Sequence, residues 1–239
     1  MNRIVPVAPD ALQPSDCLAA TEFLDFQHPA VQLHIQEKMG QSAARLQAEA
    51  GDDPDKKIQL AMRLYYHVRD GWLYNPYKLH LSPAENRLSY FTSIRSTYCI
   101  PKAMLLAGLA RACGIPARLG FGDVKNHLSS PRLIEYLRSE IFYYHGYCEL
   151  YLNNKWVQAT PAFDKRLCRK MKVDPLEFDG RTNSLFQEYN QSGQAFMQYT
   201  HYHGVTADLP LDWLKQGFAK RYPHIYAETM IDGDLMQET

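Results

Sequence analysis

Cys99 stands at the start of the segment CIPKAMLLAGLARAC, which occupies residues 99–113. Pro101 is tolerated only in the first turn of a helix, so this segment is predicted to be a helix that begins near Cys99. Gly114 and Pro116 predict where the helix ends. Backbone N–H groups and the positive end of the helix dipole stabilise a thiolate at such a position, which makes Cys99 a candidate nucleophile. The alternative is a small buried hydrophobic side chain, the commonest role of a free cysteine.

A cysteine nucleophile needs a base, and His145 is the histidine that lies in the middle of a predicted strand, IFYYHGYCELYL at 141–152. Side chains alternate between the two faces of a strand, so His145 shares its face with Tyr147, and Cys148 points the opposite way into the core. A histidine at such a position is either structural or the base of a Cys–His pair. The sequence therefore supplies a candidate base as well as a candidate nucleophile.

A third group must orient the imidazole. The Asn pair at 153–154 predicts a two-residue turn, and pairing the strands from this turn makes Thr160 the diagonal neighbour of His145. Threonine cannot supply the charge of a carboxylate. Asp164, which follows shortly after Pro161, is therefore favoured as the orienting acid. The alternatives are an orienting role for Thr160 and a dyad that has no acid.

The segments STYCIPKAMLLAGLARACGIPARLGFG and YYHGYCELYLNNKWVQATPAFD resemble the core of the transglutaminase-like superfamily of bacterial cysteine proteins, over about residues 54–164. The resemblance implies a papain-like α+β fold, in which a central buried helix carrying the Cys packs against an antiparallel sheet carrying the His and an Asp. It also implies that Cys99 is the nucleophile, that His145 is the base and that an Asp orients the base.

The sequence departs from this family pattern at two positions. Thr97 stands where members of the superfamily usually have Gly, two residues before the nucleophile. Thr160 stands where the usual W-V-x-L-D-P motif has its Asp, so Asp164 would have to replace that acid.

The elements that must position these residues can be predicted from periodicity and from turn residues. We expect an extended N-terminal arm, a long irregular segment at 75–98, and a series of regular elements. The predicted helices are 29–50, 54–71, 99–113, 131–139 and 212–222; the predicted strands are 117–124, 141–152 and 155–160, with a second pair at 185–190 and 195–203.

No linker or repeat divides the chain, so the 239 residues are predicted to form a single transglutaminase-like domain. Its core is expected at about 54–164, preceded by an arm and helix at 1–50 and followed by a C-terminal extension at 165–239. The 26 basic and 26 acidic residues give a net charge of zero, which provides no reason to expect nucleic acid as a partner. The sequence has neither a membrane-length apolar run nor a signal peptide, so we expect a cytoplasmic protein that does not bind membranes. A neutral chain is compatible with a monomer or a dimer.

The function that joins these observations is thiol-dependent acyl transfer on a peptide or protein substrate, without a cofactor. The Cys99 thiolate would attack an amide or ester carbonyl, His145 would protonate the leaving group, and water or an amine would resolve the thioester. The backbone N–H of Cys99, together with a side chain before it such as Tyr98, would bind the oxyanion.

Two other functions are compatible with the same residues. The protein could be a catalytically inactive transglutaminase-like module that binds a peptide or protein partner, an alternative favoured by Thr160. His201 and His203 could bind a metal, but no third ligand has a suitable spacing. The five cysteines are an odd number without a CxxC pair, and they predict neither a disulfide framework nor a zinc site. Several tyrosines could line a peptide groove: Tyr143, Tyr144, Tyr147 and Tyr151.

Overall fold

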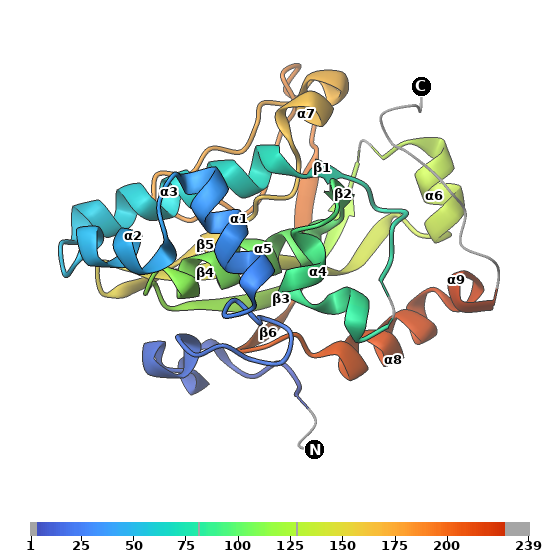
Figure 1. Cartoon of the computed structure of the whole chain (residues 1–239). Coiled ribbons are helices and arrows are strands. Elements are labelled where there is room, and N and C mark those ends of the chain that lie inside the picture. The colour runs from blue at the N-terminus through green and yellow to red at the C-terminus, as the bar shows by residue number, and fades with distance from the viewer. Residues whose placement is uncertain (1–3, 81, 128, 228–239) are drawn as a thin grey trace.

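Helix α5 (Cys99–Ala112) packs against a four-stranded antiparallel sheet (Figure 1). The computed structural model describes residues 4–80, 82–127 and 129–227. In spatial order, the strands of the sheet are β5 (Lys155–Ala159), β4 (Ile141–Leu152), β3 (Ala117–Asn126) and β6 (Met197–Thr206). The predicted α+β class is thus confirmed, with the helix that carries Cys99 against the sheet that carries His145.

The composition of α5 explains its central place. Between Cys99 and Ala112 almost every residue is Ala, Leu, Met, Ile or Gly, and all fourteen residues of the helix are buried. A helix that is apolar on every side must be covered on every side. The sheet covers one side of α5 through β3 and β4, and helices α3 (Pro54–Gly71) and α4 (Leu88–Phe91) pack on it elsewhere.

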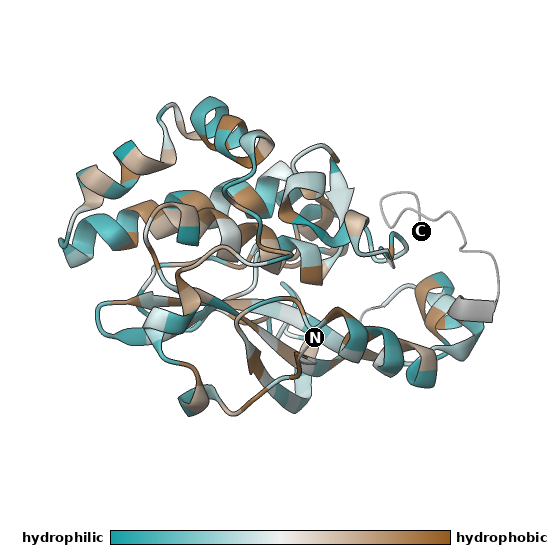
Figure 2. Cartoon of the chain, turned by 60° about the horizontal axis from the view of Figure 1, so that its bottom comes forward, coloured by the Kyte–Doolittle hydropathy of each residue, from teal (hydrophilic) through white to brown (hydrophobic). Residues whose placement is uncertain are grey.

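The remaining elements surround this centre. Figure 2 shows from a second direction that the helices form a layer over the sheet, with hydrophobic and hydrophilic residues alternating along the outer helices. These elements are α1 (Pro29–Met39), α2 (Ala43–Ala50), β1 (Leu73–Tyr74), β2 (Ser96–Thr97), α6 (Pro131–Leu137), α7 (Lys165–Met171), α8 (Leu211–Arg221) and α9 (Pro223–Ala227). In the part of the chain that the structure describes, no helix is both long and apolar enough to cross a membrane.

The predicted helix at 29–50 is wrong, because two helices occupy this segment. Helix α1 ends at Gly40, whose φ of 75° is left-handed, and the Ser42 side chain caps the start of α2 by accepting from the Arg45 N–H. A left-handed glycine followed by a serine cap stops one helix and starts another.

The hairpin that fixes the register of the candidate base has the predicted form. Asn153 and Asn154 both have positive φ, at 46° and 61°, as a two-residue turn requires. Leu152 pairs with Lys155 and Leu150 with Val157, so the predicted register of β4 and β5 is confirmed.

The predicted pairing of 185–190 with 195–203 is confirmed only next to the turn between them. There Tyr189 bridges Ala195, and the Phe196 and Met197 N–H groups donate to the Glu188 and Gln187 carbonyls. Strand β6 instead pairs along its length with β3, with Phe121 opposite Gly204. The pairing with β3 is the longer of the two, because β3 provides β6 with a ladder of backbone hydrogen bonds inside the main sheet, interrupted by two shifts of register.

Gly146 allows β4 to lie directly against the first turn of α5. A Cβ atom at this position would be 2.9 Å from the Ile100 Cα atom, closer than real Cβ contacts. We therefore expect Gly146→Ala to lower the free energy of unfolding by about 1–3 kcal/mol, as over-packing does elsewhere. Gly71→Ala is the matched control, because its Cβ would be 3.5 Å from the nearest atom. Chemical denaturation checks the pair, and equal stability of the two variants would contradict the expected clash.

Candidate active site

Cys99 is the first residue of α5, and Tyr98 precedes it as the helix cap without a side-chain capping bond. The backbone N–H groups of Gly146, Ile100 and Cys99 itself interact with the Cys99 thiolate and lower its pKa. Burial acts in the opposite direction and is the larger effect, so the pKa of Cys99 rises to about 11. At neutral pH, Cys99 is therefore a protonated thiol surrounded by N–H donors.

His145 lies in the wall of the same pocket as Cys99. This pocket, called here the Cys99 pocket, is lined by Cys99, His145, Tyr98, Tyr143 and Tyr144 together with aliphatic and aromatic side chains from other elements. Burial lowers the pKa of His145 to about 4, so the imidazole is neutral at pH 7. The structure thus brings the predicted nucleophile and the predicted base to one cavity, as a neutral pair.

Two side chains that carry hydroxyl groups, Thr160 and Tyr199, lie beside His145. Thr160 and His145 line one small cavity, and the Tyr199 ring meets the His145 ring edge-on with 6.0 Å between centroids. Burial raises the pKa of Tyr199 well above its ordinary value, while the nearby Thr160 hydroxyl lowers it. Three atoms of this group are buried and have no hydrogen-bond partner among the described residues: His145 Nε2, Thr160 Oγ1 and Tyr199 Oη. The three atoms belong to the His145 ring and to the two side chains that lie beside it.

Tyr199 could not be predicted as a site residue from the sequence, because nothing local to its segment connects it with Cys99 or His145. It lies on β6, and it reaches the site because β6 pairs with β3, where Tyr199 is opposite Val124. The sequence contains one signal for this strand, which is the aromatic character of 195–203. That signal predicts a strand but does not identify β3 as its partner.

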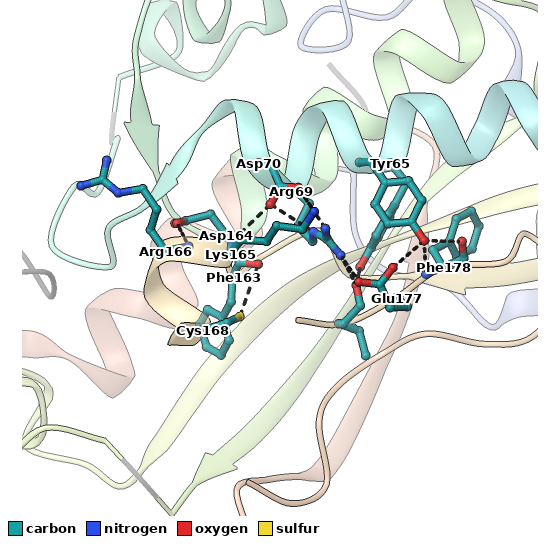
Figure 3. A network of polar contacts seen from close by, with 12 residues as sticks. Tyr65, Arg69, Asp70, Phe163, Asp164, Lys165, Arg166, Cys168, Glu177 and Phe178 are labelled. Carbon is teal, nitrogen blue, oxygen red and sulfur yellow. Dashed lines mark hydrogen bonds and ion pairs between the residues drawn. The ribbon is translucent and has the colours of Figure 1, made fainter. Parts of the chain in front are cut away.

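The structure does not bring Asp164 to His145. Asp164 Oδ1 accepts from the backbone N–H groups of Arg166 and Leu167 at the start of α7. Figure 3 shows Asp164 and Arg166 from close by. Its other oxygen, Oδ2, accepts from the Tyr74 N–H at 2.9 Å. Asp164 also lies off the sheet, beyond the end of β5. Among the described residues, no contact therefore supports the predicted orienting role of Asp164.

Asp164→Ala is expected to destabilise the fold and to leave Cys99 chemistry nearly unchanged. It removes a helix cap and leaves the buried Tyr74 N–H unpaired, which together cost about 2–4 kcal/mol. The matched control is Asp53→Ala, which removes the exposed cap of α3, where the side chain accepts from the Asp55 and Lys56 N–H groups. Denaturation measures stability, and the acylation rate of Cys99 measures chemistry. A large loss of acylation in a folded Asp164→Ala protein would restore Asp164 to the catalytic set.

Lys102 lies one turn after Cys99 and is fully buried, a feature that the apolar pattern of α5 concealed. Its ammonium group donates to the carbonyl oxygens of Arg69 at 2.8 Å and of Trp72 at 2.6 Å. Burial lowers the pKa of Lys102 to about 7, while Asp164 opposes that effect. These bonds tie the first turns of α5 to the end of α3, and so hold the backbone that presents Cys99.

The other predicted candidates have structural partners. His203 Nε2 lies 2.7 Å from Asp123 Oδ1, and the same carboxylate oxygen accepts from the Tyr144 N–H. Tyr144 has a left-handed φ of 62°, directly before His145. The described residues contain no group of three or more His, Cys, Asp or Glu side chains that could hold a metal. Of the tyrosines predicted to line a groove, Tyr143 and Tyr144 line the Cys99 pocket, and Tyr147 and Tyr151 do not.

Comparison with known proteins matches a segment of the chain to a family. The family description "Transglutaminase-like superfamily" matches residues 44–161. Among solved structures, the chain is similar to a candidate cysteine protease from Cytophaga hutchinsonii, at 15% identity and a TM-score of 0.39. That match covers 66% of this chain and 45% of the other, so the chain spans less than half of that protein. Among curated proteins, no sequence matches. Residues 44–161, which include Cys99 and His145, belong to the transglutaminase-like superfamily.

Proposed function

We propose that this protein is a thiol-dependent acyl-transfer enzyme that cleaves or transfers a peptide-like amide, with Cys99 as nucleophile and His145 as base. The observation that carries the proposal is the position of Cys99. Its sulfur lies at the N-terminus of a buried helix and accepts hydrogen bonds from the backbone N–H groups of Gly146, Ile100 and Cys99. Cys99 also lines the same pocket as His145.

The neutral pair determines how the first step would run. As the Cys99 sulfur attacks the carbonyl carbon, the thiol proton passes to neutral His145, and the carbonyl oxygen takes the negative charge. The N–H groups of the first turn that point to the Cys99 sulfur are those of Cys99 and Ile100, because Pro101 has none and the Lys102 N–H bonds to the Tyr98 carbonyl. These donors, with Tyr98 in the wall of the pocket, are suited to stabilise the oxyanion.

The same proton completes the cycle. His145 gives it to the leaving amine or alcohol, which departs and leaves a Cys99 thioester. Water or an incoming amine then loses a proton to His145 while it attacks the thioester. The acyl product leaves, and His145 returns the proton to the Cys99 sulfur. This chemistry needs no cofactor, and its direction depends on whether water or an amine enters.

A catalytically inactive binding module is the second candidate function, and one specific observation favours it. No carboxylate among the described residues is hydrogen-bonded to His145 Nε2, and burial keeps both the thiol and the imidazole neutral. A pair of this kind lacks the preformed thiolate that speeds many cysteine enzymes. The two functions differ in one measurable property, which is whether His145 accelerates acylation of Cys99.

That difference can be measured with p-nitrophenyl acetate as the acyl donor. Release of p-nitrophenol gives the rate, and peptide mass spectrometry locates the acetyl group. We expect acetylation at Cys99, and a rate about 10²-fold lower in His145→Ala, the usual contribution of a general base. Added imidazole should restore part of the rate by entering the space that the side chain leaves. Acetylation of Cys99 at equal rates in both proteins would overturn the enzyme and favour the binding module.

The pH dependence of acylation follows from the two pKa values. His145 becomes a competent base above its pKa of about 4, and Cys99 stays protonated until its pKa of about 11. The expected rate therefore rises between pH 3 and 5, is flat through neutral pH, and rises again only above about pH 10. A preformed thiolate–imidazolium pair would instead give its inflections between about pH 6 and 8.5, near the ordinary values of His and Cys. Stopped-flow measurement at constant ionic strength distinguishes the two profiles.

A further inference from the structure

The walls of the Cys99 pocket are mainly aromatic and aliphatic. Apart from Cys99 and His145, its lining consists of tyrosines, a proline and apolar side chains. They come from separate parts of the chain, among them Leu79 before α4, Leu137 at the end of α6, Phe142 on β4, Phe218 on α8, Tyr222 directly after α8, and Ile225 on α9. Elements within the family core and elements that follow it thus close around the candidate nucleophile.

The lining carries no charge at neutral pH. None of the residues that line the pocket is Asp, Glu, Lys or Arg. Its histidine is neutral at pH 7, since burial lowers the pKa of His145 to about 4. Burial also raises the pKa of Tyr74 and Tyr222 well above their ordinary values, which keeps both phenols protonated.

The hydrogen-bonding groups of the lining are partly occupied. The Tyr222 hydroxyl donates to the Ile141 carbonyl at 3.0 Å and accepts from the Tyr143 N–H at 2.8 Å. These two hydrogen bonds to β4 hold the Tyr222 ring in place in the wall of the Cys99 pocket. The surface that Tyr222 presents to the pocket is therefore mainly its aromatic face.

We infer that the Cys99 pocket receives an apolar side chain of the acyl donor, so that the substrate is a peptide-like amide or ester whose acyl residue is leucine-like or phenylalanine-like. An acyl group attached to Cys99 has its own side chain a few atoms from the sulfur, and Cys99 itself lines the apolar pocket. An apolar side chain gains free energy by leaving water for such walls. A charged side chain would lose its hydration and find no opposite charge. This inference rests on the proposed function, because it needs Cys99 to be the residue that is acylated.

Chloromethyl ketones of N-acetyl amino acids test this specificity directly. The Cys99 sulfur displaces chloride from the methylene carbon and forms a thioether, and the thiol proton is released to the base. The reagents of Phe, Leu, Ala, Lys and Glu are compared by the second-order rate of Cys99 modification, measured by peptide mass spectrometry. Each rate is divided by the rate of the same reagent with glutathione, which removes differences in intrinsic reactivity.

We expect the Phe and Leu reagents to react about 10- to 100-fold faster than the Ala reagent, as burial of a large apolar side chain predicts. The Lys and Glu reagents should be slower than the Ala reagent. Equal rates for Phe, Leu and Ala would overturn the inference. A preference for Glu would also overturn it, and would point to Arg221, whose guanidinium lies 4.4 Å from the centre of the Tyr143 ring.

Iodoacetamide separates failure of this inference from failure of the proposed function, because it has no side chain to place. If iodoacetamide and p-nitrophenyl acetate both fail to modify Cys99, the proposed function fails. If they modify Cys99 with dependence on His145 and the chloromethyl ketones show no preference, only the pocket assignment fails.

A charge placed in the wall gives a second, independent readout. Leu79 is half-buried and lies outside the regular elements, so Leu79→Lys is expected to fold. It should raise the rate of the Glu reagent relative to the Phe reagent by about 10-fold or more. Leu33→Lys is the matched control, since Leu33 is 58% exposed on α1 and is not among the residues that line the pocket. Unchanged reagent preference in a folded Leu79→Lys protein would contradict the assignment.

Discussion

Cys99→Ala is expected to lose covalent acylation by p-nitrophenyl acetate altogether, a decrease of about 10³-fold or more in the rate of p-nitrophenol release. Alanine has no atom that can attack the carbonyl or form the thioester. The substitution removes a single sulfur atom from a residue that is 8% exposed. The cost in stability is therefore expected to be about 1 kcal/mol, which lowers the melting temperature by only a few degrees in a chain of this size.

Cys113→Ala is the matched control for this loss. Cys113 lies at the opposite end of α5, is buried like Cys99, and has its pKa raised to about 12 by burial. Both variants remove one buried sulfur from the same helix, so their effects on melting should be similar. Only Cys99→Ala should abolish acylation, because only Cys99 shares a pocket with His145. Loss of acylation in both variants, or in neither, would contradict the assignment of Cys99 as nucleophile.

The helix that begins at Cys99, the strand that carries His145 and the fold class could be predicted from the sequence because their signals are local. Pro101 and Gly114 limit the helix of Cys99 to within one residue of its observed bounds. The Asn153–Asn154 turn fixes the register of β4 and β5, and so the face on which His145 lies. Local turn and cap chemistry determines such elements almost independently of the rest of the chain.

Asp164 and Tyr199 could not be placed in this way. An Asp followed by Lys-Arg-Leu is compatible with an orienting acid and with a helix cap, and the distinction depends on where the Tyr74 N–H lies in space. The place of Tyr199 depends on the pairing of β6 with β3, two strands that are far apart in the sequence. Contacts between distant segments are determined by the whole fold and leave no local pattern in either segment.

The divided helix at 29–50 is a different kind of error. The signals for two helices, Gly40 and Ser42, are present in the sequence. The apolar spacing of Val31, Ile35, Met39 and Leu46 continues across the break, and periodicity alone cannot report a stop. At this point the cap residues, and not the periodic pattern, determine where the first helix ends.

Thr160→Asp is expected to raise the reactivity of Cys99, the second large effect that the structure predicts. Thr160 occupies a cavity wall beside His145, and Thr160 Oγ1, His145 Nε2 and Tyr199 Oη are buried without partners among the described residues. A carboxylate at this position can accept from His145 Nε2–H and from the Tyr199 hydroxyl. Acceptance by a charged group favours imidazolium, so the pKa of His145 should rise from about 4 toward or above its ordinary value.

A more basic His145 takes the thiol proton more readily, and its positive charge stabilises the thiolate. We expect acylation by p-nitrophenyl acetate at pH 7 to be about 10- to 100-fold faster in Thr160→Asp, part of the effect that an orienting acid has in other triads. The pH profile should change with it, because the lower inflection moves upward from pH 4 toward neutral pH. NMR titration of the His145 ring measures the pKa of the base directly.

Two further substitutions at this position separate charge from shape. Thr160→Asn has the shape of Asp without its charge, and Thr160→Val has the shape of Thr without its hydroxyl. Both should leave the pKa of His145 near 4 and the acylation rate within a few-fold of the unmodified protein. If Asn accelerates acylation as much as Asp, orientation rather than charge limits the Cys–His pair. If Asp folds normally and leaves both the His145 pKa and the rate unchanged, Thr160 does not face Nε2, and the neutral pair must act without support from that side of the ring.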